Sequence, residues 1–139
     1  MAEIHPQLRK DCLLIGRFAL SHLLLMRDAN YPWFILVPDR EGITEIYQLG
    51  EADQRQLLWE SSHLAQTLAE RFSPDKLNIA ALGNVVPQLH VHHVVRRCDD
   101  AAWPAPVWGT APARAYTDDE LARVLANVEG AFADFCCQR

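Results

Sequence analysis

The stretch GNVVPQLHVHHVV, residues 83–95, carries the strongest local pattern in the chain. Polar and apolar side chains alternate along its second half, which is typical of a β-strand, and we predict a strand from Gln88 to Arg96. Side chains two residues apart on a strand share a face and lie roughly 6–7 Å apart. One face should therefore carry Gln88, His90 and His92, and the other should carry Leu89, Val91 and His93.

A row of one amide and two imidazoles suits the chemistry of a phosphoryl group. A neutral imidazole is a good nucleophile toward phosphorus near neutral pH. A second imidazole, if protonated, can donate a charge-assisted hydrogen bond to a phosphoryl oxygen, and the Gln88 amide can donate another without titrating. Because phosphoryl transfer depends mainly on positioning and charge stabilisation, the row predicts a site for that reaction.

Two other interpretations of the row remain open from the residues alone. His90 and His92 could be zinc ligands, although a catalytic zinc site normally has three protein ligands and no third one is obvious nearby. The histidines could also be polar positions on a half-buried strand, with no chemistry, and periodicity alone favours this interpretation.

The remaining chain predicts an α+β fold of helices packed on an antiparallel sheet. A turn is expected at residues 28–32, and Pro38 should end the strand that follows this turn. The expected helices are residues 4–11, Glu51 to Phe72 and a segment starting at Thr117; the expected strands are one within Leu13 to Met26, then Trp33 to Val37, Lys76 to Leu82 and Gln88 to Arg96. With 139 residues, the chain should be a single domain, 1–139, with its core in 13–96 and a C-terminal loop and helix in 97–139.

Composition excludes several classes of protein. A net charge of −5 argues against a general nucleic-acid binder, which would show a basic face. The longest apolar run, Leu20 to Met26, is too short to span a bilayer, so no membrane segment is expected. Four cysteines without C-x-x-C spacing predict free thiols in a reducing cytoplasm; they are Cys12, Cys98, Cys136 and Cys137.

The irregular stretch from Arg97 to Tyr116 is long for a compact domain, which suggests a functional loop or one ordered by a partner. Its Trp103 and Trp108 could stack on a nucleobase or cover a site, or they could pack on the sheet or on a dimer partner. The neighbouring arginines could reach phosphates, but a solvated surface is expected for each of them: Arg96, Arg97 and Arg114. His93 should be structural or solvent-facing, and His22 and His63 should be surface or packing residues.

The motif Gln88-x-His90-x-His92, preceded by Gly83-Asn84, resembles the signature of the histidine-triad (HIT) superfamily, and bacterial members with Gln-Leu-His-Val-His in particular. The strand Ile35-Leu36-Val37-Pro38 resembles the apolar strand that those proteins carry upstream. The match covers about residues 13–96. It implies a HIT-like fold with about five antiparallel strands and two main helices, and a homodimer that joins two such sheets.

The resemblance also implies roles for individual residues. His90 falls on the histidine that attacks the α-phosphate of a nucleotide, and His92 on the one that contacts the phosphate or leaving group. Gln88 would be the third catalytic residue. The remaining implied residues bind substrate: Asn84 and Gly83 at the phosphate, and Asn78, Asp28 and Asn30 near the ribose and base.

The implied function is a nucleotide hydrolase or transferase, hydrolase being favoured. It would cleave a nucleoside monophosphate from a nucleotidyl ester, a dinucleoside polyphosphate or a phosphoramidate, with no metal and no cofactor. The alternative is a nucleotide-binding or interaction protein with little turnover. Two departures from the family support that alternative: Gln88 replaces the first histidine, and Trp33 stands where many HIT hydrolases have a fourth histidine. The segment Asp39-Arg40-Glu41 also replaces the family's Lys-x-His.

Overall fold

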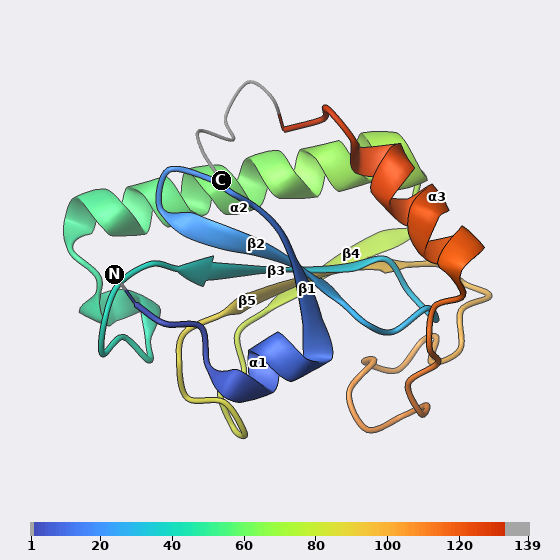
Figure 1. The fold of residues 1–139 in the computed structure, drawn as a ribbon, viewed down its shortest axis with the longest axis horizontal. Helices are drawn as coiled ribbons and strands as arrows, with labels where there is room; N and C mark the ends of the chain where they lie inside the picture. The colour runs from blue at the N-terminus through green and yellow to red at the C-terminus, as the bar shows by residue number, and fades with distance from the viewer. Residues whose placement is uncertain (1, 133–139) are drawn as a thin grey trace.

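The computed structural model describes residues 2–132. This part of the chain forms one sheet of five strands with three α-helices around it (Figure 1). The strands are β1 Cys12–Arg17, β2 Ser21–Met26, β3 Trp33–Pro38, β4 Lys76–Ala80 and β5 Val91–Arg96; the helices are α1 Pro6–Asp11, α2 Glu51–Phe72 and α3 Asp118–Val128, with a short 3-10 turn at Ile46–Gln48.

The sheet has the strand order β1-β2-β3-β5-β4, and every neighbouring pair is antiparallel. The long helix α2 covers one face, with α3 beside one end of it, while α1 and the loop from residue 97 to residue 116 lie on the other side (Figure 1). Each face buries its own apolar cluster, so this is the α+β sandwich that the sequence predicts. The histidine strand β5 lies between β3 and β4, where both of its faces are covered.

The helices follow the predicted patterns closely. Helix α2 has the predicted bounds and buries Leu57, Leu64 and Leu68 along one stripe. It ends at Ser73, whose φ of 48° is left-handed and which is followed by a proline. Thr117 caps α3 through the predicted capping box with Glu120.

The strand predictions need three corrections. The segment Leu13 to Met26 holds parts of two strands, β1 and β2, which form a hairpin instead of one strand. Strand β4 ends at Ala80, two residues earlier than expected, and α1 begins at Pro6. The prediction that β5 starts at Gln88 is wrong, because Leu89 donates its N–H to the Ile43 carbonyl instead of to a neighbouring strand.

No helix within residues 2–132 combines the length and the apolarity needed to cross a bilayer. Cys12 is buried and Cys98 is exposed, and both are free thiols. Burial, with help from the Asp11 carboxylate, raises the pKa of Cys12 to about 12. Cys136 and Cys137 lie outside the described residues.

Candidate active site

Strand β5 sends its two consecutive histidines to opposite faces of the sheet. His93 pairs with Phe34 and faces α2, where its Nε2 lies 2.7 Å from Ser61 Oγ. Its Nδ1 donates to the Val91 carbonyl, so Nε2 accepts from the Ser61 hydroxyl. His93 has no exposed surface, and burial lowers its pKa to about 4. The structural role expected for His93 is confirmed, and a solvent-facing position is wrong.

His90 and His92 lie side by side on the other face, with ring centroids 4.8 Å apart. They are 7% and 4% exposed, so the expectation of a half-exposed strand does not hold. Residues 97–116 and the N-terminal segment cover this face and bury both rings. The part of the second interpretation that made the histidines exposed polar positions is therefore wrong.

The hydrogen bonds of His90 define its tautomer. Its Nδ1 lies 2.7 Å from the Gln88 carbonyl oxygen, which can only accept, so Nδ1 carries the proton. The neutral ring therefore has a bare lone pair on Nε2. Burial lowers the pKa of His90, partly offset by the Gln88 carbonyl and reinforced by nearby His5. The ring is held neutral, in the form in which an imidazole can act as a nucleophile.

His92 has the opposite tautomer. The Trp33 indole N–H donates to its Nδ1 at 3.0 Å, so a neutral His92 carries its proton on Nε2. Burial, reinforced by the neighbouring His90 and His93, lowers the pKa of His92 to about 3. The sequence-based hypothesis of a protonated second imidazole is thus wrong in the unliganded protein, because His92 is a neutral N–H donor.

Trp108 closes this face of the sheet over the same residues. Its ring lies 5.0 Å from that of His92 and 5.6 Å from that of Trp33, edge to face in both cases. Trp103 lies with its ring 5.5 Å from the Arg96 guanidinium carbon. Both tryptophans therefore pack against side chains of the sheet, which was one of the two roles expected for them.

Gln88 lies before β5 and binds the N-terminal segment. Its Oε1 accepts from the His5 backbone N–H at 2.8 Å, and its Nε2 donates to the Glu3 carbonyl at 2.9 Å. No local pattern predicts this contact, because the partners are more than eighty residues apart and no motif joins them. His5 is the residue that the sequence analysis missed.

Comparison with known proteins agrees with this geometry. The family model described as HIT domain matches residues 7–99, well over half of the chain. The chain belongs to the HIT family.

Solved HIT structures from bacteria share the fold over nearly the whole chain. A histidine triad protein from Marinobacter aquaeolei VT8 is 46% identical with a TM-score of 0.93, covering 97% of this chain and 98% of its own. One from Bradyrhizobium japonicum is 46% identical with a TM-score of 0.89, covering 91% and 95%. One from Sinorhizobium meliloti 1021 is 38% identical with a TM-score of 0.88, covering 91% and 94%. A search of curated proteins gives no match.

Three residues that the HIT resemblance assigns to the nucleoside also have contacts within the protein. Asp28 Oδ1 accepts from the backbone N–H groups of Asn30 and Arg114, and the Asn30 amide donates to the Pro112 carbonyl. Asn78 Oδ1 accepts from Arg96 at 2.7 Å. These bonds join the turn at residues 28–30 to the loop that follows β5, and strand β4 to the last residue of β5.

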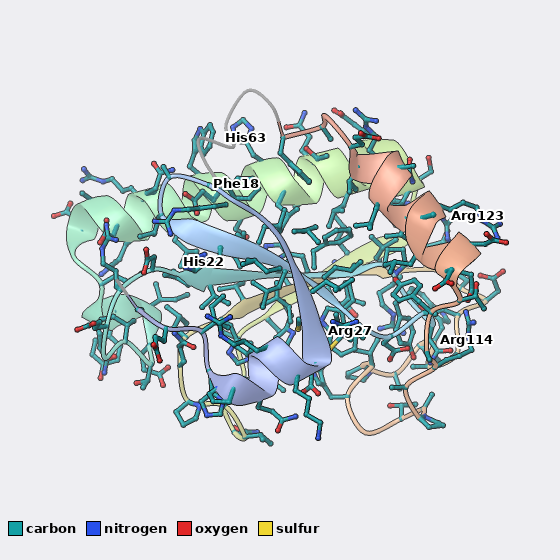
Figure 2. All side chains as sticks on the ribbon, viewed as in Figure 1. Phe18, His22, Arg27, His63, Arg114 and Arg123 are labelled. Carbon is teal, nitrogen blue, oxygen red and sulfur yellow. The ribbon has the colours of Figure 1, made fainter. Side chains whose placement is uncertain are left out.

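Arg96 corrects another expectation, since it is one of the largest fully buried side chains and not a surface residue. Its guanidinium pairs with Asp100 at 2.8 Å and donates to the Ala105 carbonyl. Arg97 and Arg114 are exposed, as expected, and Arg114 lies next to the start of α3, where it pairs with Glu120 (Figure 2).

The two residues proposed at the phosphate lie in the loop between β4 and β5. Gly83 has a φ of 81°, a conformation that favours glycine, and Asn84 is exposed. His22 on β2 and His63 on α2 lie away from this loop in the fold, and His63 packs on Trp59 (Figure 2). Among residues 2–132, no group of three or more His, Cys, Asp or Glu side chains is arranged to hold a metal ion.

Proposed function

We propose that this HIT protein is a nucleotide hydrolase that works through a nucleotidyl intermediate on His90. The observation that carries the proposal is the pair of opposite tautomers on adjacent rings. His90 presents a bare nitrogen, and His92, with its ring centroid 4.8 Å away, presents an N–H. A phosphoryl group placed against both rings would meet a nucleophile and a hydrogen-bond donor together.

In the first step, the Nε2 lone pair of His90 attacks the α-phosphorus. The bond from phosphorus to the leaving group breaks, the leaving group departs with the electron pair, and it takes a proton from solvent. In the second step, water attacks the phosphorus and the N–P bond breaks, which releases a nucleoside monophosphate and returns the lone pair to His90. A different acceptor in place of water would make the same reaction a transfer.

The other residues stabilise charge and position the substrate. The Nε2–H of His92 donates to a phosphoryl oxygen or to the leaving group. The Gln88 amide has two N–H groups, of which Glu3 uses one, so the second can donate to the phosphate. Gly83 and Asn84 would line the phosphate, while Asn78, Asp28 and Asn30 would lie toward the nucleoside.

The test is to trap the intermediate. The protein is mixed with adenylyl and guanylyl esters, phosphoramidates and dinucleoside polyphosphates, and is denatured at high pH, where a phosphorus–nitrogen bond to histidine is comparatively stable. We expect a mass increment of one nucleoside monophosphate on the peptide that contains His90. His90→Ala should lose both the adduct and turnover, whereas His63→Ala, on the far side of the sheet, should keep both.

Comparable turnover by His90→Ala, or an adduct on His92 or His93, would show that the nucleophile is wrongly assigned. Circular dichroism of His90→Ala keeps the result interpretable, because the ring is nearly buried and its loss could affect folding.

A second candidate function is nucleotide binding with little turnover. The observation that favours it is the low exposure of both rings, with Trp108 packed against that of His92. The same panel separates the two: saturable nucleotide binding without any adduct or product, in the wild-type protein, would support binding alone.

A further inference from the structure

Gln88, at the first position of the triad motif, contacts the backbone of a distant segment on one side and a catalytic ring on the other. Its side chain bonds to both the Glu3 carbonyl and the His5 N–H, and its own carbonyl accepts from His90 Nδ1. One residue thus fixes the N-terminal segment and orients the nucleophile. Any movement of residues 3–5 is thereby linked to the triad motif.

The geometry explains why an amide suits this position. In an extended chain, the carbonyl of one residue and the N–H two residues later point to the same side, as Glu3 and His5 do here. The oxygen and nitrogen of a glutamine amide lie side by side and match that pair. The two ring nitrogens of a histidine diverge, so a histidine at position 88 could not make both bonds.

The segment that Gln88 holds places an imidazole at a cavity. The cavity has a volume of about 670 Å³, and its walls are residues 2–6, Arg9, residues 40–44 and Gln88. His90 and His92 are not wall residues, and Gln88 joins the cavity to the triad because its carbonyl accepts from His90 Nδ1. His5 Nδ1 accepts the Gln7 backbone N–H at 3.0 Å, so the neutral His5 ring carries its proton on Nε2. His5 therefore has the same tautomer as His92, a neutral ring with an N–H to donate.

We propose that His5 is the third imidazole of the active site, held there by Gln88, and that its Nε2–H donates to an oxygen of the bound phosphoryl group. The inference rests on the proposed function and names a further residue for the same site. His5 and His92 would then each supply a neutral N–H donor beside the bare nitrogen of His90.

The role is hydrogen bonding without proton transfer. A neutral His5 has one proton, on Nε2, and giving it away would leave an imidazolate. The cavity walls carry charges of both signs, from Arg9 and Arg40 and from Glu3 and Glu41, so the walls as a whole do not make a strongly cationic site.

The test must separate the proposed role of the His5 imidazole at the phosphate from its role as the N-cap of α1. His5→Ser keeps a good capping side chain and removes the ring. We expect it to slow single-turnover formation of the His90 adduct by about 100-fold, the lower end of the loss seen when one preorganised donor is removed. Gln7→Ala, which leaves the ring in place, should have no comparable effect.

The dependence on Gln88 gives a second readout. Gln88→His restores the family residue but should free the N-terminal segment and slow the adduct as His5→Ser does. If His5 acts only through its placement by Gln88, the double variant should be no slower than the slower of the two single variants. Independent, multiplying losses would overturn the claim that Gln88 holds His5 in the site.

A third readout needs no turnover, so it distinguishes failure of the proposed function from failure of the inference about His5. Inorganic phosphate is titrated into the protein while the histidine ring nitrogens are followed by ¹⁵N NMR. We expect the His5 and His90 signals to shift together, with a weaker phosphate affinity in His5→Ser. If the wild type forms the adduct but His5→Ser matches it in rate and in phosphate affinity, His5 has no role while the His90 mechanism stands. If the wild type forms no adduct, the proposed mechanism fails, and unchanged phosphate affinity in His5→Ser would overturn the inference as well.

Discussion

At the scale of single residues, the site depends on which nitrogen of each ring carries a proton. Trp33 sets this for His92 by donating its indole N–H to Nδ1. Trp33 stands where many HIT hydrolases have a histidine, and a tryptophan can only donate at this nitrogen. Trp33 therefore makes the neighbouring imidazole a permanent acceptor at Nδ1 and a donor at Nε2.

Trp33→Phe tests whether the indole N–H sets the His92 tautomer, because it keeps an aromatic ring and removes the N–H. Without the donor at Nδ1, His92 should sample both tautomers, while burial, which phenylalanine preserves, should keep its pKa low. We expect turnover to fall roughly 3–10-fold, the equivalent of about 1 kcal/mol for a single neutral hydrogen bond. The tautomer and the pKa are read from ¹⁵N NMR of the His92 ring.

Trp108→Phe is the matched control for Trp33→Phe, since Trp108 also packs against His92 and is not the residue that donates to Nδ1. It should leave the His92 tautomer unchanged. An unaltered His92 spectrum in Trp33→Phe would mean that the indole does not set the tautomer.

At the scale of elements, a buried ion pair between Arg96 and Asp100 helps to hold the loop of residues 97–116 to the sheet. Arg96, at the end of β5, binds Asp100, Asn78 and the Ala105 carbonyl, and its guanidinium lies over the ring of Tyr31. Asp100 also accepts from the backbone N–H groups at the start of the loop. Because Trp108 belongs to this loop, the ion pair also supports the cover over His92.

Asp100→Asn should therefore destabilise the protein. Removing the charge leaves Arg96 buried without its ionic partner, which costs roughly 3 kcal/mol or more. Urea unfolding measures the loss, and Asp99→Asn, an exposed neighbour, should change the midpoint little. Equal midpoints for the two variants would show that the pair contributes nothing.

The pH dependence of stability should differ between the wild type and Asp100→Asn. Burial opposes ionisation of Asp100, but bonds from Arg96 and from backbone N–H groups outweigh it and lower its pKa. A lowered folded pKa gives stability that is present above the unfolded value of about 4 and is lost as pH falls through the folded value. The wild type should lose this contribution on acidification, and Asp100→Asn should show a shallower acid dependence.

At the scale of the whole molecule, one edge of the sheet is suited to pairing with a second copy. Strand β4 lies at the edge, with unpaired backbone groups along one side. Ile79 on this strand is 49% exposed, and Leu82 and Val85 just after it are 41% and 82% exposed. An apolar edge of this kind agrees with the homodimer that the HIT resemblance implies.

Ile79→Lys should therefore give a monomer, because a charge on an edge strand opposes edge-to-edge pairing. Light scattering of the wild type should give the mass of a dimer. The control is Leu14→Lys on β1, the opposite edge, which is 57% exposed and should stay dimeric. A wild type that is monomeric at all concentrations would contradict the prediction.

The sequence by itself determined the fold class, the bounds of α2, the capping box of α3 and the histidine motif. These features depend on periodicity and on residues a few positions apart, so a single stretch of chain contains the information. The alternation within β5 also placed His92 and His93 on opposite faces. The start of β5 was wrong because Leu89 bonds to Ile43, a partner that no local pattern indicates.

Only the tertiary structure decided the state of the catalytic rings. The Trp33 bond to His92 joins residues 59 apart, and the Gln88 bond to His5 joins residues 83 apart. Burial under the loop and the N-terminal segment lowers the histidine pKa values, and Arg96 is buried because Asp100 and Asn78 meet it inside the fold. Charge, tautomer and burial depend on what packs around a side chain, and that is set by contacts between distant parts of the chain.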